Sequence, residues 1–182
     1  MFIQTEATPN PSTLKFLPGQ DVMGPKGTAD FQTADSAAQS PLAQRLFALE
    51  GVEGVFLGYD FVTVTKADDQ SWPFLKPLVL SSIMEHYTEE QPIYLGEKAG
   101  EGDVNEDALS QQIRELIDTR VRPAVAQDGG DIVFRHFSDG IVYLNMQGAC
   151  AGCPSSTATL RNGIENMLKY YVPEVVAVQA VE

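Results

Sequence analysis

Cys150 and Cys153 are the residues of this 182-residue chain best suited to chemistry, and they are its only cysteines. Thiols at this C-x-x-C spacing can bind a soft metal ion, exchange a disulfide or cross-link a turn. A strand-like alternation of apolar residues precedes the pair, and a helical pattern follows it. Pro154 suits the first position of that helix, so we predict that Cys153 caps the helix and that the helix dipole stabilises its thiolate.

The number of available ligands limits the metal sites that this chain can form. A tetrahedral iron or zinc site takes four protein ligands, and the chain offers two thiols and two histidines. His86 lies in the other half of the chain, and His136 falls on the predicted core face of a strand, so we interpret both as packed, hydrogen-bonded side chains. Two chains that meet at their Cys150 loops supply four thiolates, the ligand number of both common iron–sulfur clusters. The sequence therefore predicts a homodimer that shares a cluster.

The same thiol pair supports two other hypotheses. A thiol–disulfide oxidoreductase of the thioredoxin type places the motif after the first strand of a βαβ unit, whereas here it follows a predicted antiparallel hairpin, so redox chemistry ranks second. A zinc-stabilised interaction module ranks third. A cluster held on loops at an interface loses half its ligands when the subunits part. That lability favours a non-enzymatic carrier over an electron-transfer protein.

Charge and hydropathy exclude several classes of protein. With 12 Lys and Arg against 25 Asp and Glu, the net charge is -13, which argues against binding to nucleic acid or to an anionic membrane surface. No apolar run reaches the roughly 18 residues of a membrane-spanning helix. Residues 1–7 lack the pattern of an export signal. Two cysteines make no disulfide framework, so we expect a reducing compartment.

Composition divides the chain once. Residues 96–105 carry three glycines and three acids with almost no apolar content, which predicts a flexible linker. We therefore expect one domain over residues 1–95 and a second over residues 106–182. Each is predicted to be a small two-layer α+β domain.

The first domain is predicted from short apolar runs. A helix begins behind Ser40-Pro41 and stops at Gly51, and a second helix over residues 71–86 carries an apolar stripe that starts at Trp72. Residues 18–40 are expected to form a long loop with at most one brief element. The predicted strands cover residues 2–8, 12–16, 55–57 and 61–65, the last two as a hairpin across residues 58–60.

The second domain is predicted in the order α-β-β-α-β. Its first helix bends or restarts at Pro123, and a three-residue loop over residues 138–140, with a bulge at Gly140, joins strands 132–137 and 141–146. That register places Ile132, Phe134, Val142, Leu144 and Met146 on one buried face. The second helix presents Leu160, Ile164, Met167, Leu168 and Tyr171 on its core side, and a strand over residues 174–181 closes the domain.

Two sets of motifs resemble a known family. Residues 106–182 are similar to the C-terminal NifU-type domain through the segments Arg122–Ile132, Gln147–Ser156 and Leu160–Ile164. Residues 1–95 resemble the N-terminal domain of the Nfu proteins through Thr8-Pro-Asn-Pro11, Leu14-Lys-Phe16 and Phe61-Val-Thr-Val-Thr-Lys66. The motifs occur in the family order and cover nearly the whole chain.

The resemblance implies a carrier that receives an assembled [4Fe-4S] cluster, or alternatively a [2Fe-2S] cluster, from an upstream scaffold protein and delivers it to apo iron–sulfur enzymes. Cys150 and Cys153 stand at the family's two ligand positions, with the cluster bridging two protomers. The longer nitrogen-fixation relatives have further domains that do not match here, so transfer is expected rather than de novo assembly. The family implies a bacterial cytoplasm, or the mitochondrial matrix for a processed eukaryotic form. Lipoyl synthase, aconitase-like and respiratory enzymes are typical family recipients.

Overall fold

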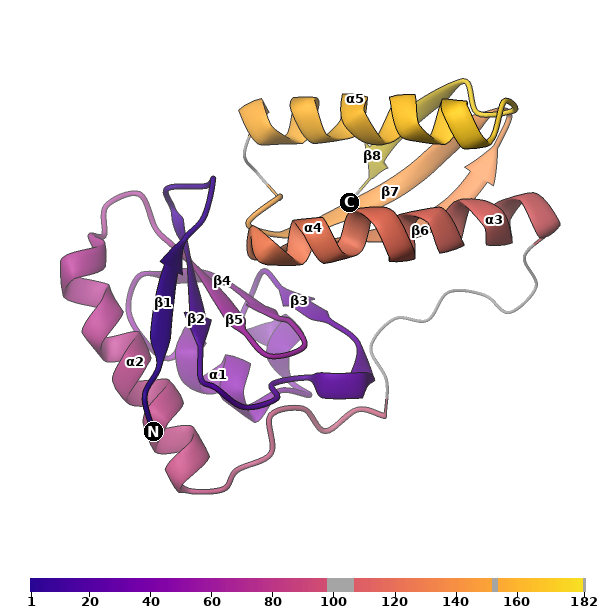
Figure 1. Cartoon of the computed structure of the whole chain (residues 1–182). Helices are drawn as coiled ribbons and strands as arrows, with labels where there is room; N and C mark the ends of the chain where they lie inside the picture. Colours follow the sequence, from indigo (N-terminus) through magenta and orange to yellow (C-terminus); the bar gives the residue numbers. More distant parts are fainter. Residues whose placement is uncertain (98–106, 152–153, 182) are drawn as a thin grey trace. The chain divides into compact units, whose positions relative to one another are not determined.

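The computed structural model describes residues 1–97, 107–151 and 154–181, without the side chains of residues 154–156. These residues form two compact units, Met1–Gly100 and Glu101–Glu182 (Figure 1). Each unit combines a sheet with helices, which confirms the expected α+β class. The predicted linker, residues 96–105, lies almost wholly outside the described residues. The domain bounds 1–95 and 106–182 therefore stay predictions.

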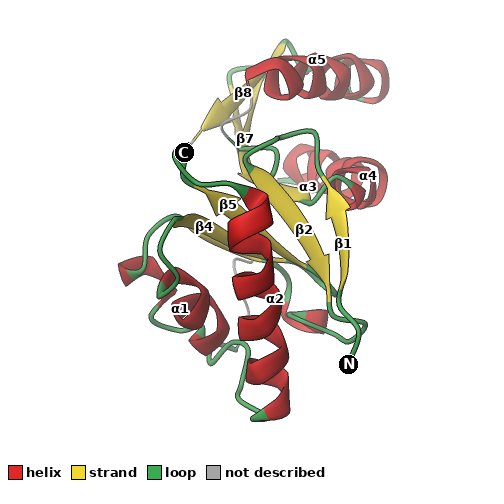
Figure 2. Cartoon of the chain, turned by 90° about the vertical axis from the view of Figure 1, so that its left-hand side faces the viewer, coloured by secondary structure: helices red, strands yellow, loops and turns green. Residues whose placement is uncertain are grey.

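Unit 1 is built on a five-stranded antiparallel sheet in the order β1-β2-β5-β4-β3. Two α-helices and two short 3-10 helices complete it, and Figure 2 shows α1 and α2 in front of the strands. Its elements are β1 Gln4–Ala7, β2 Thr13–Leu17, η1 Gly24–Lys26, β3 Ala29–Phe31, η2 Asp35–Ala37, α1 Pro41–Phe47, β4 Val52–Leu57, β5 Val62–Lys66 and α2 Trp72–Thr88.

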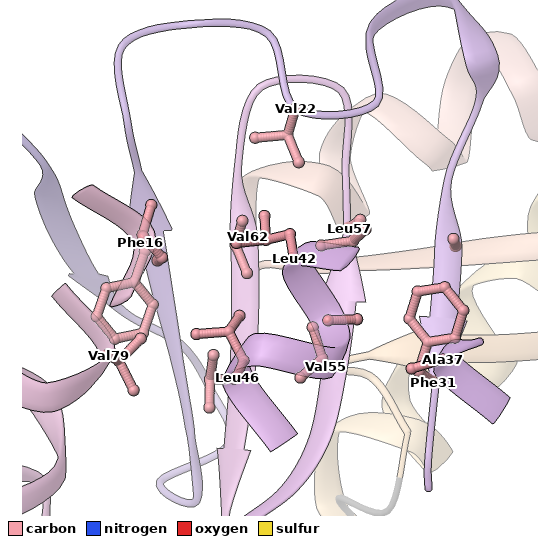
Figure 3. Close-up of a cluster of buried hydrophobic side chains, with 14 of the residues drawn as sticks. Phe16, Val22, Phe31, Ala37, Leu42, Leu46, Val55, Leu57, Val62 and Val79 are labelled. Atoms are coloured by element: carbon pink, nitrogen blue, oxygen red, sulfur yellow. The ribbon is translucent and has the colours of Figure 1, made fainter. Parts of the chain in front are cut away.

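One apolar cluster joins the helices to the sheet (Figure 3). Because side chains alternate along a strand, the strands turn one set of apolar residues toward α1 and α2. The two helices carry apolar residues at helical spacing. These residues cover the apolar side chains of the strands, which gives the two-layer arrangement. The buried members include Phe16, Val55, Leu57, Val62 and Val64 from the strands, Leu42 and Leu46 from α1, and Leu75, Val79 and Ile83 from α2.

The start of α1 is held by Ser40, which directly precedes the first helical residue, Pro41. Its hydroxyl accepts a hydrogen bond from the Ala43 amide at 3.1 Å and donates one to the Ile93 carbonyl at 2.8 Å. The segment after α2 is thereby tied onto α1, and the Leu95 amide adds a bond to the Gln39 carbonyl at 2.8 Å. One hydroxyl thus both caps a helix and anchors the end of unit 1.

The stretch of residues 18–40 contains more structure than expected. Besides η1 and η2, it contributes the edge strand β3, whose residues Ala29 and Phe31 pair with Leu57 and Val55 of β4. With three residues, this strand shows no alternation long enough to predict. It is stabilised by backbone pairing and by the burial of its two apolar side chains.

Unit 2 carries a three-stranded sheet in the order β6-β7-β8, with β6 antiparallel and β8 parallel to β7. Its first helix is interrupted near Pro123, as predicted: a π-helical turn widens the backbone just before the residue that lacks an amide hydrogen. The elements are α3 Ala108–Leu116, η3 Ile117–Val121, α4 Arg122–Gln127, β6 Gly130–Ser138, β7 Ile141–Gly148, α5 Pro154–Tyr171 and β8 Ala177–Val181.

The five residues predicted for the buried sheet face are all buried, but the predicted loop is wrong. Ser138 pairs with Ile141, so the hairpin turns on two residues, Asp139 and Gly140, which both have positive φ angles, 54° and 78°. The extra residue lies instead at Arg135, where a bulge between Phe134 and His136 shifts the register by one. The bulge restores the face that a two-residue loop alone would scatter.

The same bulge overturns the placement of His136. Its side chain lies on the exposed face of β6 and stacks on Tyr143, with 4.3 Å between ring centroids, and is not in the core. Tyr171 also departs from the predicted core stripe of α5. It is exposed, and the Arg120 guanidinium lies 4.8 Å from its ring centroid. Ile164 and Leu168 of that stripe are buried as expected.

His86 predicts a pH dependence of unit 1. Its ring is buried, its Nε2 lies 3.1 Å from the Pro92 carbonyl oxygen, and its Nδ1 has no hydrogen-bond partner in the structure. Burial, with a smaller effect of the Arg45 charge, lowers the pKa of His86 below the ordinary 6.5. As pH falls below about 6.5, the unfolded chain therefore takes up a proton that the folded chain resists, and stability falls. Above that pH the ring is neutral in both states and contributes no slope.

We expect His86→Gln to remove this part of the pH slope. Urea unfolding between pH 8 and pH 5 measures it, with His136→Gln as the control because that ring is exposed. An equal slope in both variants would contradict the assignment.

Candidate functional site

Cys150 stands in the turn between β7 and α5, beside the first residues of β6. Pro154 is the first residue of α5, as predicted. Cys153, its predicted role as helix cap and the adjacent Gly152 lie outside the described residues. The structure therefore places one of the two predicted ligands, and the pairing of Cys150 with Cys153 stays a prediction from their spacing.

Three hydrogen bonds hold the Cys150 turn. The Ala149 amide donates to the Gly129 carbonyl at 3.1 Å, and the Ala151 amide donates to the Gly148 carbonyl at 3.1 Å. From the first turns of α5, the Thr157 hydroxyl donates to the Cys150 carbonyl at 3.0 Å. The turn is thus tied to the start of β6 on one side and to α5 on the other.

The thiol itself lies against a glycine. A Cβ atom on Gly130 would lie 2.6 Å from the Cys150 Sγ and 2.8 Å from the Gln147 carbonyl oxygen, both closer than real Cβ contacts. Only the bare α-carbon of Gly130 leaves room for the sulfur. Cys150 is 7% exposed and belongs to the apolar cluster of unit 2.

An ion pair fixes the strand that carries Gly130. The Arg122 Nε and Nη2 atoms donate to the two carboxylate oxygens of Asp131 at 2.8 and 2.7 Å, and Asp118 accepts a further bond from Nη1 at 3.2 Å. Asp131 also accepts from the Ile132 amide at 2.8 Å. The hydrogen bond to buried Asp131 raises the pKa of the Arg122 guanidinium above its usual value. This two-pronged pair locks α4 to the first residues of β6.

The topology around the thiol corrects one step of the sequence argument. β7, α5 and β8 form a βαβ unit with parallel neighbouring strands, and Cys150 follows the first of these strands. Because β7 also belongs to the antiparallel hairpin with β6, the hairpin pattern concealed the crossover. The position of the motif therefore does not count against thiol–disulfide chemistry.

Comparison with known proteins assigns the family. The description "Scaffold protein Nfu/NifU N terminal" matches residues 3–90, and "NifU-like domain" matches residues 113–179. The NFU1 iron-sulfur cluster scaffold homolog, mitochondrial, of Homo sapiens is 49% identical over 184 aligned residues, which cover 100% of this chain and 72% of the human protein. The chain belongs to the Nfu family. The similarly named Drosophila sechellia protein is 48% identical over 185 residues, and this chain spans only 65% of its length.

Among solved structures, a NifU-like protein from Saccharomyces cerevisiae, determined by solution NMR, is similar to part of this Nfu chain. The match covers 51% of this chain and 84% of the yeast chain, at 28% identity and a TM-score of 0.46.

The other candidate residues of the Nfu chain take structural roles. His86 is packed and hydrogen-bonded, as expected. Within residues 1–97, 107–151 and 154–181, no three His, Cys, Asp or Glu side chains gather as a metal site. In the same part of the chain, no helix is both long and apolar enough to cross a bilayer.

Sequence reasoning did not foresee the contact of Gly130 with the thiol or the clamp of Arg122 on Asp131. A glycine at the start of a strand is a signal of close backbone approach, and it was available at Gly129-Gly130. The salt bridge joins residues nine apart across a helix end and a turn, a spacing that no regular period marks.

Gly130→Ala is expected to lower the free energy of unfolding by about 1–3 kcal/mol, because the methyl group must displace the Cys150 sulfur or the strand. Gly163→Ala in α5 is the matched control. Gly163 has open space around it, so alanine there should stabilise the chain by up to about 1 kcal/mol. Urea unfolding measures both, and thiol labelling in a Cys153→Ser background should show faster modification of Cys150 in Gly130→Ala. Equal stability of the two variants would contradict the contact.

Arg122→Ala should destabilise unit 2 by about 3 kcal/mol, since it leaves the buried Asp131 carboxylate without its two guanidinium hydrogen bonds. Lys169→Ala removes an exposed pair four residues from Glu165 and should cost only about 0.5 kcal/mol. Thermal unfolding measures the stability of both variants. Similar losses of stability would contradict a larger contribution from the buried pair.

Proposed function

We propose that this Nfu protein is a carrier that binds an iron–sulfur cluster through Cys150 and Cys153 and transfers it to apo-proteins. The observation that carries the proposal is the Cys150 thiol at the β7–α5 turn, with Cys153 three residues later in the sequence, in a chain whose family relatives are named iron-sulfur cluster scaffolds. Iron–sulfur clusters are held by cysteine thiolates, four for each common cluster.

The ligand number makes the carrier a homodimer in its loaded form. One chain supplies two cysteines, so a second copy supplies the other two. We propose a [4Fe-4S] cargo, with [2Fe-2S] as the alternative. The cluster is cargo rather than the means of a reaction, so no enzymatic activity is proposed.

The burial of Cys150 bears on loading. Its sulfur lies in the apolar cluster against Gly130, so binding the cargo requires the side chain to leave that contact. Loading then exchanges an apolar contact for a metal–thiolate bond, and release to an acceptor restores the contact. The hydrogen bond from Thr157 and the strand pairing of Gly130 keep the turn in place during this exchange.

The proposed partners are an upstream scaffold that supplies the cluster and apo iron–sulfur enzymes that receive it. The named relatives are mitochondrial proteins, which favours the mitochondrial matrix over the bacterial cytoplasm as the place of action. The net charge of -13 continues to argue against nucleic acid and anionic membranes as partners.

Anaerobic reconstitution with iron and sulfide tests the proposal. We expect a brown protein with about four irons per two chains, because two pairs of thiolates hold one cubane. Cys150→Ser and Cys153→Ser should each abolish the visible absorption, whereas His136→Ala should retain it. Full cluster absorption in either cysteine variant, or its absence from the reconstituted wild type, would refute the carrier function.

Thiol–disulfide exchange is the second candidate because the βαβ topology around Cys150 permits it. It requires reduction of insulin disulfides by the reduced protein and a reversible bond between the two cysteines. The carrier proposal expects neither at a catalytic rate. Activity of the wild type that both Cys→Ser variants lose would favour the oxidoreductase, and zinc in protein purified without oxygen would favour the interaction module.

A further inference from the structure

Helix α2 carries apolar residues on its exposed side as well as on its buried side. Leu75, Val79, Ile83 and His86 are buried against the core of unit 1. Between them, Phe74, Leu78 and Met84 are 66%, 40% and 41% exposed, and the neighbouring Pro73 and Pro77 are exposed as well. A helix that is apolar all round normally has both faces covered. In the residues described, the second face of α2 is bare.

The start of α2 is held by contacts of Trp72. The Trp72 indole N–H donates to the Pro11 carbonyl at 3.2 Å, and the Trp72 ring meets Phe16 edge-on with 6.3 Å between centroids. The loop that supplies Pro11 is itself ordered, since the Ser12 amide donates to the Asn10 side chain at 3.0 Å. A preorganised apolar surface loses little conformational freedom when it binds.

Acidic residues flank the apolar face at both ends. Asp68 and Asp69 precede α2 and are exposed. Three carboxylates lie at the other end. Arg45 pairs with Glu85 and Glu89, and the third carboxylate, Glu90, is exposed. Within α2, Lys76 is half-buried and His86 is buried. The exposed apolar residues run from Pro73 to Met84, a length of about 16 Å, with exposed Ser81 and Glu85 on the same side of the helix.

We propose that this face of α2 docks a basic amphipathic helix of a partner protein. The apolar side of the partner helix packs against the ridge formed by Phe74 and Leu78, which lie one turn apart, as in other helix–helix contacts. Its Lys or Arg residues at both ends meet the carboxylates at both ends of α2. A second copy of this chain is disfavoured because it would bring the same acidic flanks together.

The apoprotein and two synthetic peptides of about 18 residues test the proposal. Both peptides carry a leucine stripe without tryptophan, one with lysines at its ends and the other with glutamates. Anisotropy of the labelled peptide gives the dissociation constant, and emission from Trp72, the chain's only tryptophan, reports whether binding occurs at the start of α2. We expect saturable binding of the basic peptide, at least tenfold tighter than that of the acidic one.

Phe74→Ser with Leu78→Ser should weaken binding at least tenfold, which corresponds to about 1.4 kcal/mol. Tyr170→Ser is the matched control, because Tyr170 is an equally bare aromatic, 80% exposed, in unit 2. Since all three side chains are exposed, unfolding midpoints should stay close to that of the wild type. The proposal is overturned if the basic peptide fails to bind, if both peptides bind alike, or if the double variant binds as the control does. An apoprotein dimer that the double variant dissociates would assign the face to a second copy.

Discussion

The close approach of the Cys150 sulfur to the α-carbon of Gly130 is the constraint on which the site depends. It brings the β7–α5 turn against the start of β6. The Arg122–Asp131 pair fixes the start of that strand, and the Thr157 hydroxyl ties the turn to α5. A thiol placed in this way is largely shielded from solvent.

Ligand number links this local geometry to function. A cluster needs four thiolates and the chain has two, so the proposed carrier binds its cargo between two chains. Under this proposal the dimer lasts only as long as its metal–sulfur bonds, which suits delivery better than storage. The proposed docking face on α2 belongs to unit 1, and Cys150 belongs to unit 2. The two proposals therefore assign partner selection and cluster binding to different units.

Much of the fold could be predicted because hydrophobic periodicity is local. The buried stripe of α2 and the buried face that includes Ile132 and Leu144 both follow from spacing. The hairpin loop could not be predicted in the same way, because two different loop lengths give the same buried face once a bulge is allowed at Arg135. His136 was misplaced for that reason: beyond the bulge, the alternation changes phase.

At the site, the two cysteines could be selected from sequence as candidate ligands, whereas the packing of Cys150 could not be predicted. The contact with Gly130 joins positions 20 apart and depends on how β6 meets the turn. The parallel pairing of β7 with β8 likewise requires knowledge of the whole sheet. Native mass spectrometry of the reconstituted protein tests the central claim most directly, since it reports iron, sulfide and chain number on one particle. The account predicts that cluster mass is found only on particles of two chains, and a complete cluster on a single chain would contradict it.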